Sequence, residues 1–187
     1  AEFAKSHDIR LYECYLTAQF RCNGSDAFIN WVNHTLNIEV TANPFWEASN
    51  PFEFKIFDSP EALEKAIHAK AAEKASARMS AGFCWKWSNP DAKGNLLDDV
   101  VVGDWKRPWD AKPGAGRLAK GIPPAALWAY DPNGLGQVGC VYTAQGFEFD
   151  YIGVIIGKDL VYRSDKGWVG VREESCDTMV KRSKDKF

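Results

Sequence analysis

The six residues 151–156, with the sequence YIGVII, restrict the fold of this chain more than any other stretch. Apart from its glycine the run is apolar or aromatic, and it lacks the alternation of polar and apolar residues that a half-exposed strand shows. Such runs are typical of strands buried on both faces, as in parallel sheets that helices cover on both sides. We therefore expect residues 151–156 to be an inner strand of an α/β fold.

Two segments combine a helical pattern with a capping signal. Ser25 suits the N-cap of a helix that runs to Leu36, whose apolar residues recur at the spacing of one helical face. Ser59 followed by Pro60 opens a second helix, because proline is favoured at the first helical position. Strand patterns occur at residues 9–21, 52–57, 77–85, 99–102, 137–141, 159–163 and 168–171. This order of elements predicts an α/β three-layer sandwich.

The composition indicates a globular protein with one unusual segment. Of 187 residues, 45% are hydrophobic and 26% are charged, so a packed core is expected in one domain or in one domain with an insertion. Residues 88–136 are rich in proline, glycine and tryptophan, and we interpret them as an insertion made mainly of loops. The formal net charge of −2 excludes a histone-like protein but allows a local basic groove.

Several kinds of site and location are disfavoured. The 5 cysteines contain no CxxC pair and the 3 histidines lie far apart, so we expect neither a disulfide framework nor a metal site. No apolar run approaches the ~20 residues that span a bilayer, and no signal peptide is recognisable. These features predict a cytoplasmic protein with no membrane partner. The motifs GxxxxGK[ST], GxGxxG, HExxH and GxSxG are all missing from the sequence.

The strongest chemical signal is the segment 141–156, VYTAQGFEFDYIGVII. We expect a strand to end near Tyr142 and Thr143 to stand at the start of a short helical turn, where backbone N–H groups favour anions. Gly146 allows a ligand to approach closely. Glu148 and Asp150 would then be acceptors at the carboxyl edge of the sheet, where α/β proteins bind ligands. A capped turn with solvated acidic residues is the simpler alternative.

Two further segments contain groups that bind phosphate or bases. Arg21 follows a predicted strand, and its guanidinium can bind phosphate oxygens bidentately, although a lone arginine there is often only a surface ion pair. The segment WKRPW interleaves Trp105 and Trp109 with Lys106 and Arg107. Such residues can stack bases and hold the phosphates of a single strand. Alternatively, the tryptophans attach the loops to the core.

Residues 143–150, TAQGFEFD, resemble motif V of superfamily 1 helicases. The resemblance implies that Thr143 touches a nucleic-acid phosphate and that Glu148 reaches the ribose of ATP. It also implies that Gln145 and Gly146 couple the nucleic-acid and ATP sites.

Residues 16–25, LTAQFRCNGS, resemble motif IV of the same superfamily. This second resemblance implies that Arg21 meets the γ-phosphate of ATP and acts as the catalytic residue of the chain. Gln19 would contact the nucleotide.

More specifically, the chain is similar to the Schlafen group 3-like DNA/RNA helicase domain family. Motif V and four segments carry this similarity: residues 19–25, 81–87, 103–109 and 128–134. The resemblance implies a C-terminal, second RecA-like domain, incomplete, with a mostly parallel sheet and no phosphate loop. The family's phosphate loop and magnesium-binding acidic residues belong to a preceding RecA-like domain, which is thus the implied partner, together with DNA or RNA. ATP and Mg²⁺ would bind the longer protein, and we expect neither to bind this chain by itself.

Three other functions stay open on the sequence. The chain could be a non-motor nucleic-acid-binding module that uses the tryptophan-rich segment. It could be a Schlafen-like regulatory or nuclease-associated domain, in which the motor fold serves assembly. It could also be an unrelated small-ligand protein with a motif V look-alike.

Overall fold

The computed structural model describes residues 6, 10, 12, 25–47 and 52–183. The chain forms two compact units, Ala1–Phe54 and Lys55–Phe187, and each is described by itself. Among the helices in the described ranges, none has the length and apolar character needed to cross a membrane.

The first unit contains the helix α2 (Asp26–Thr35), which confirms the predicted first helix. The Ser25 side chain accepts a hydrogen bond from the Phe28 N–H at 3.2 Å and so caps the helix. One helix face carries Phe28 and Trp31, whose rings pack with those of Trp46, Phe52 and Phe54. These five rings hold the described part of the unit together.

The predicted strand at 52–57 is wrong, because these residues form no strand. Phe52 and Phe54 turn their rings to the aromatic cluster, with centroids 4.1 Å from Phe28 and 4.7 Å from Trp31. Ile56, the third apolar residue of the alternation, is exposed. Ring packing on a helix thus accounts for the pattern that alternation alone assigned to a sheet.

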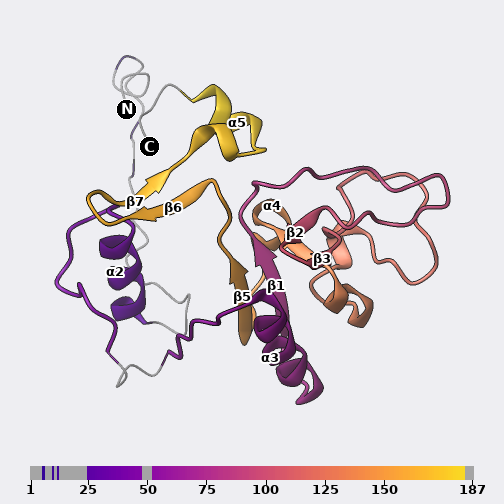
Figure 1. Ribbon diagram of the computed structural model, residues 1–187, viewed down its shortest axis with the longest axis horizontal. Coiled ribbons are helices and arrows are strands. Elements are labelled where there is room, and N and C mark those ends of the chain that lie inside the picture. The colour runs from indigo at the N-terminus through magenta and orange to yellow at the C-terminus, as the bar shows by residue number, and fades with distance from the viewer. Residues whose placement is uncertain (1–5, 7–9, 11, 13–24, 48–51, 184–187) are drawn as a thin grey trace. The chain divides into compact units, whose positions relative to one another are not determined.

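The second unit is built on a parallel sheet of three strands, which confirms an α/β fold with a parallel sheet (Figure 1). The central strand β1 (Ala77–Ala81) pairs with β4 (Val138–Cys140) on one side and β5 (Tyr151–Ile155) on the other. On the other side of β4, Trp109 forms an isolated parallel bridge with Val138.

The helix α3 (Pro60–Ala72) covers one face of this sheet, as Figure 1 shows, and confirms the predicted second helix. The Ser59 side chain caps it by accepting from the Ala62 N–H at 3.2 Å. The helix lies so close to β5 that a Cβ at Gly153 would come within 3.0 Å of the Leu63 and Ile67 side chains. Glycine at this position therefore allows close packing of helix on strand.

Trp128 covers the opposite face of the sheet. Its ring lies on Gly139 of β4, where an added Cβ would be 2.1 Å from a ring carbon. Its carbonyl accepts from the Arg78 Nε at 3.1 Å, and the same guanidinium donates to the Asp131 carbonyl at 2.8 Å. The buried Arg78 thus attaches the segment around Trp128 to the central strand.

The expectation that residues 151–156 are buried on both faces is wrong. Gly153 and Ile155 are buried under α3, whereas Ile152 and Val154, on the other face, are 41% and 59% exposed. The reason is that β5 is the last strand of the sheet within the described residues, and the segment around Trp128 covers the neighbourhood of β4 instead.

Two antiparallel hairpins and several short helices complete the unit. Residues predicted as strands at 99–102, 159–163 and 168–171 lie in the hairpins rather than in the parallel sheet. The hairpins pair β2 (Val100–Val102) with β3 (Trp105–Arg107), and β6 (Leu160–Arg163) with β7 (Gly167–Gly170). The short helices are η2 (Ala125–Leu127), η3 (Pro132–Gly136), α4 (Val141–Ala144), η4 (Arg172–Glu174) and α5 (Thr178–Arg182).

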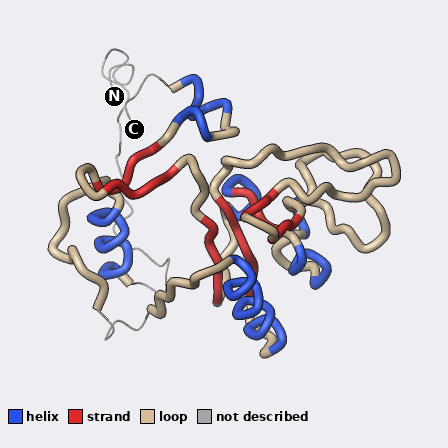
Figure 2. Tube along the Cα trace, in the orientation of Figure 1, coloured by secondary structure: helices blue, strands red, loops and turns tan. Residues whose placement is uncertain are grey.

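Residues 88–136 are mainly loops, as Figure 2 shows, and indole groups attach them to the rest of the unit. Trp85, Trp87 and Trp109 donate their indole N–H groups to the carbonyls of Val101, Asp110 and Lys86 at 2.9–3.0 Å. The loops are therefore fixed by hydrogen bonds as well as by ring packing.

A buried carboxylate joins α3 to the β2–β3 hairpin. Glu64 accepts from the Arg107 guanidinium at 2.5 and 2.7 Å and from the Trp105 indole N–H at 3.0 Å. Burial would raise the pKa of Glu64, but the hydrogen bonds from Arg107 and Trp105, with the charge of Arg107, lower it below its ordinary value. Glu64 therefore stays ionised and holds the hairpin on the helix.

Replacing Glu64 by glutamine should reduce the free energy of unfolding by about 1–2 kcal/mol at pH 7, with exposure of Arg107 limiting the loss. Because the pKa of Glu64 is lowered by folding, its contribution is complete above about pH 4.5 and is lost as the pH falls through the folded value. Urea unfolding followed by tryptophan fluorescence measures both effects. Glu61→Gln, on the exposed side of the same helix, is the control, and an equal loss there would contradict the assignment.

Candidate functional site

The segment 141–150 begins at the carboxyl end of β4. The strand ends at Cys140, and the predicted helical turn is α4, although it starts one residue before the expected strand end at Tyr142. The Thr143 hydroxyl accepts from the Cys140 N–H at 3.1 Å and donates to the Cys140 carbonyl at 3.0 Å. Because the hydroxyl is bonded to the Cys140 backbone, it closes the turn, and Thr143 is buried there.

The residues after α4 divide into an inner and an outer set. Phe147 packs edge-to-face on Tyr130 at 5.2 Å between ring centroids, and Phe149 packs on Trp128 at 6.0 Å. The residues between and before them, Gln145, Gly146 and Glu148, are exposed. The two phenylalanines therefore fix the backbone, while Gln145, Gly146 and Glu148 are exposed and can contact a ligand.

Gly146 has a φ of 87°, a conformation in which a side chain is strained. No atom lies within 4 Å of the place where its Cβ would be, so open space adjoins this residue. The glycine is thus required by the backbone conformation and also leaves room for a close approach.

The expected position of Asp150 at the carboxyl edge is wrong. Asp150 precedes β5, and its carboxylate accepts from the N–H and hydroxyl of Ser76 at 2.7 and 2.8 Å. Since Ser76 precedes β1 and the two strands are parallel, both residues lie at the amino edge of the sheet. The bonds from Ser76 lower the pKa of Asp150, whose role is to align the starts of the two strands.

Asp110 is a buried residue of this site that the sequence reasoning missed. Its side chain is fully buried, and Oδ1 accepts from the Cys140 N–H at 3.3 Å, beside Thr143. Oδ2 has no hydrogen-bond partner among the described residues. Burial raises the pKa of Asp110 to about 7, although hydrogen bonds from Thr143 and Cys140 oppose this. No local motif marks Asp110, because only the fold brings it beneath α4.

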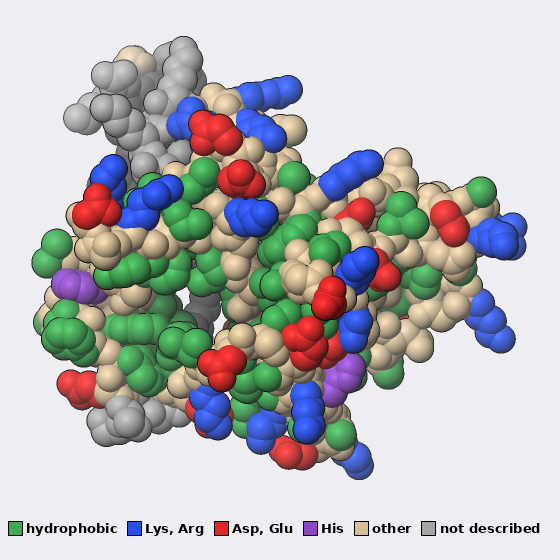
Figure 3. Space-filling model, viewed as in Figure 1, with side chains coloured by type: hydrophobic (Ala, Val, Ile, Leu, Met, Phe, Trp, Pro, Cys, Tyr) green, Lys and Arg blue, Asp and Glu red, His purple; other side chains and the backbone are tan. Residues whose placement is uncertain are grey.

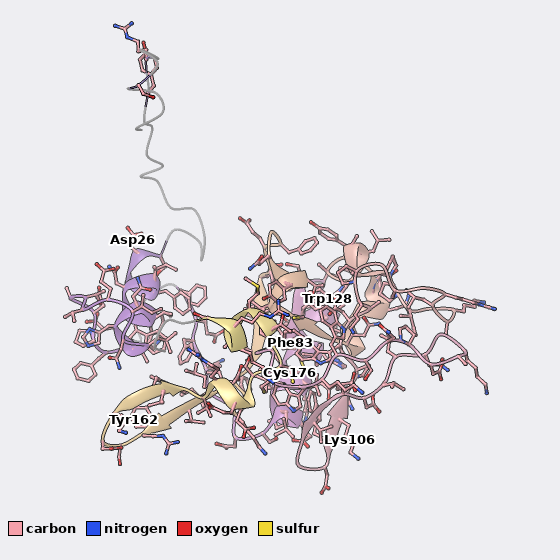
Figure 4. The ribbon with its side chains drawn as sticks, turned by 90° about the horizontal axis from the view of Figure 1, so that it is seen from above. Asp26, Phe83, Lys106, Trp128, Tyr162 and Cys176 are labelled. Carbon is pink, nitrogen blue, oxygen red and sulfur yellow. The ribbon has the colours of Figure 1, made fainter. Side chains whose placement is uncertain are left out.

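The residues of the WKRPW segment lie in different environments. Trp105 and Trp109 are only 4% and 1% exposed, so their rings pack in the core, as the loop-attaching alternative expects. Arg107 binds Glu64. Lys106 is exposed and labelled in Figure 4 on the β2–β3 hairpin. Lys106 is thus the exposed cation of the segment that forms no ion pair among the described residues.

Two predicted residues, Gln19 and Arg21, lie outside the described residues. Of the other predicted residues, Thr143, Gln145, Gly146 and Glu148 lie on the connection between β4 and β5, where Thr143 is buried and the other three are exposed. Within the described ranges, no cluster of three or more histidine, cysteine, aspartate or glutamate side chains is arranged to hold a metal ion.

Replacing Asp110 by asparagine should stabilise the protein more at pH 7.5 than at pH 4.5. In the unfolded chain Asp110 is mostly ionised at both pH values, whereas the raised pKa keeps the folded carboxyl protonated until the pH approaches 7, so wild-type stability falls as the pH rises through this interval. The difference between the two proteins in the free energy of unfolding should therefore grow by about 3 kcal/mol over this interval. Urea unfolding at both pH values measures it, with Asp104→Asn at an exposed position as the control. A difference in unfolding free energy that is the same at both pH values would contradict the raised pKa of the buried Asp110 carboxyl.

Comparisons with known proteins extend the resemblance seen in the sequence. The chain matches the family described as Schlafen group 3, DNA/RNA helicase domain over residues 1–186. It is also similar to an uncharacterized protein of Saccharomyces cerevisiae, with 29% identity over 174 residues. That alignment covers 87% of this chain and 36% of the yeast protein, so the chain spans about a third of that relative's length. No solved structure matches the chain. Because the family match extends over nearly every residue, the chain belongs to the Schlafen group 3 DNA/RNA helicase domain family.

Proposed function

We propose that this chain is the C-terminal, second RecA-like domain of an ATP-dependent DNA or RNA helicase or translocase. The observation that carries the proposal is the connection after β4, which leaves Gln145, Gly146 and Glu148 exposed while two phenylalanines fix the backbone between them. Family membership supports a helicase-like role. The parallel sheet fits a RecA-like domain, whose full three-layer arrangement is part of the proposal.

In this proposal the chain forms the far wall of an ATP cleft. A preceding RecA-like domain supplies the phosphate loop and the Mg²⁺ ligands. Glu148, an exposed carboxylate, accepts hydrogen bonds from the ribose hydroxyls, and Gln145 and Gly146 border the nucleotide. Gln19 contacts the nucleotide, and Arg21 neutralises charge on the γ-phosphate during transfer, a role worth 10³–10⁵ in rate for arginines of this kind.

The nucleic-acid track in this proposal uses Thr143 and Lys106. The Thr143 hydroxyl donates its proton to the Cys140 carbonyl, so donation to a phosphate requires it to exchange that hydrogen bond when the cleft closes. Such an exchange would link the ATP cleft to the track. Lys106 offers a solvent-exposed charge to phosphates. Trp105, Arg107 and Trp109 support the track by packing and by the bond to Glu64.

The substitution Glu148→Gln tests the ATP cleft in a protein that contains this chain together with the preceding domain. We expect the KM for ATP to rise about tenfold, because glutamine keeps an acceptor oxygen but loses the charge, and a hydrogen bond to a charged acceptor exceeds one to a neutral acceptor by about 1–1.5 kcal/mol. ATP hydrolysis stimulated by single-stranded nucleic acid gives the KM. Glu173→Gln, at an exposed position distant in sequence from the connection, is the control. Equal KM values for both variants and wild type would remove Glu148 from the ATP site.

The 187-residue chain by itself should show no Mg²⁺-dependent ATP hydrolysis, because its sequence contains no phosphate loop. Phosphate release from the purified chain, with and without an oligonucleotide, measures this. Turnover that survives purification to constant specific activity would contradict the assignment to the second domain.

A further inference from the structure

The β6–β7 hairpin is a short, well-defined element of the second unit. Its strands pair Tyr162 with Trp168 and Arg163 with Gly167. The turn closes through a hydrogen bond from the Lys166 N–H to the Arg163 carbonyl at 3.1 Å, and Gly167 has a φ of 74°. The turn geometry sets the register of the two strands, so the side chains at paired positions have defined neighbours.

The β6–β7 hairpin carries a pair of aromatic rings, Tyr162 and Trp168, and the Tyr162 ring is exposed to solvent, unlike the buried rings of the WKRPW segment. Their centroids lie 5.7 Å apart with an interplanar angle of 75°, an edge-to-face arrangement that orients both rings. Tyr162 is 66% exposed, whereas Trp109 is 1% exposed. Figure 4 labels Tyr162 on this hairpin. A base can therefore approach Tyr162 but cannot approach Trp109 without disrupting the core.

Basic side chains lie next to these rings. Arg163 and Lys166 are exposed, and within the described part of the chain neither forms an ion pair. Asp165 is the acidic residue between them, so the segment Leu160–Gly170 has a net charge of +1. Figure 3 shows lysine and arginine side chains around the hairpin turn. This charge favours an anionic partner that also offers flat rings.

We propose that the β6–β7 hairpin binds single-stranded nucleic acid, with Tyr162 stacking on a base and Arg163 and Lys166 holding adjacent phosphates. Single strands fit better than duplexes, because their bases are free to stack on an aromatic ring. This inference rests on the proposed function and adds a second contact surface to the proposed track. It also names the aromatic residue that takes the stacking role expected of Trp105 and Trp109.

The test measures binding of the full chain to fluorescein-labelled dT20 and rU20 by fluorescence anisotropy. Tyr162→Ala should weaken binding about 5- to 150-fold, the range for loss of one stacked base. Tyr162→Phe, which keeps the ring, should bind within about twofold of wild type. The double variant Arg163→Ala and Lys166→Ala should also bind more weakly. The slope of its log dissociation constant against log salt concentration should fall by the amount that corresponds to about two phosphate contacts.

The matched controls remove similar groups elsewhere. Phe45→Ala removes an exposed ring from the first unit, and Lys65→Ala removes an exposed charge from α3. If Tyr162→Ala binds like Phe45→Ala, or if Tyr162→Phe binds as weakly as Tyr162→Ala, the stacking proposal is overturned while nucleic-acid binding by the chain stands. If wild type binds neither oligonucleotide, the hairpin proposal fails, whereas ATP turnover in the longer protein still tests the proposed motor domain separately.

Discussion

Burial of β1 between two parallel neighbours is the constraint on which the second unit depends. A strand that is central in a parallel sheet needs cover on both faces, and this chain provides two different kinds. On one face α3 approaches so closely that Gly153 is required. On the other face a single indole, Trp128, lies on Gly139, and Arg78 holds its backbone in place. The connection that carries the candidate site then packs on the same indole through Phe149.

This arrangement makes the tryptophan-rich segment part of the core. Trp105 and Trp109 belong to the same buried cluster as Ile67 of α3 and Met79 of β1. Glu64 adds a charged bond between the helix and the β2–β3 hairpin, and Asp110 comes to lie under α4 because Trp109 bridges to β4. The segment that we interpret as an insertion therefore supplies buried groups that support the site.

Much of the secondary structure could be predicted because it depends on local signals. Ser25 and Ser59 cap their helices as expected, and the strands at β1, β4 and β5 lie within or overlap the predicted segments. The errors arose where long-range packing decides. Residues 52–57 alternate like a strand but pack rings on a helix. Ile152 and Val154 are apolar yet exposed, because burial of a strand face depends on what lies over it.

The sequence by itself determined the chemistry of the motif, with Thr143 at the helical turn, a glycine where φ is positive and a carboxylate at Glu148, because these are local properties of a few successive residues. Only the tertiary structure decided which of those groups can meet a ligand. In the folded chain the Thr143 hydroxyl is buried against Cys140, Asp150 lies at the amino edge of the sheet, and the aromatic rings of the WKRPW segment are buried. The tertiary structure left Tyr162 exposed beside Arg163 instead. The physical reason is that accessibility depends on contacts between residues distant in sequence, and no local pattern records those contacts.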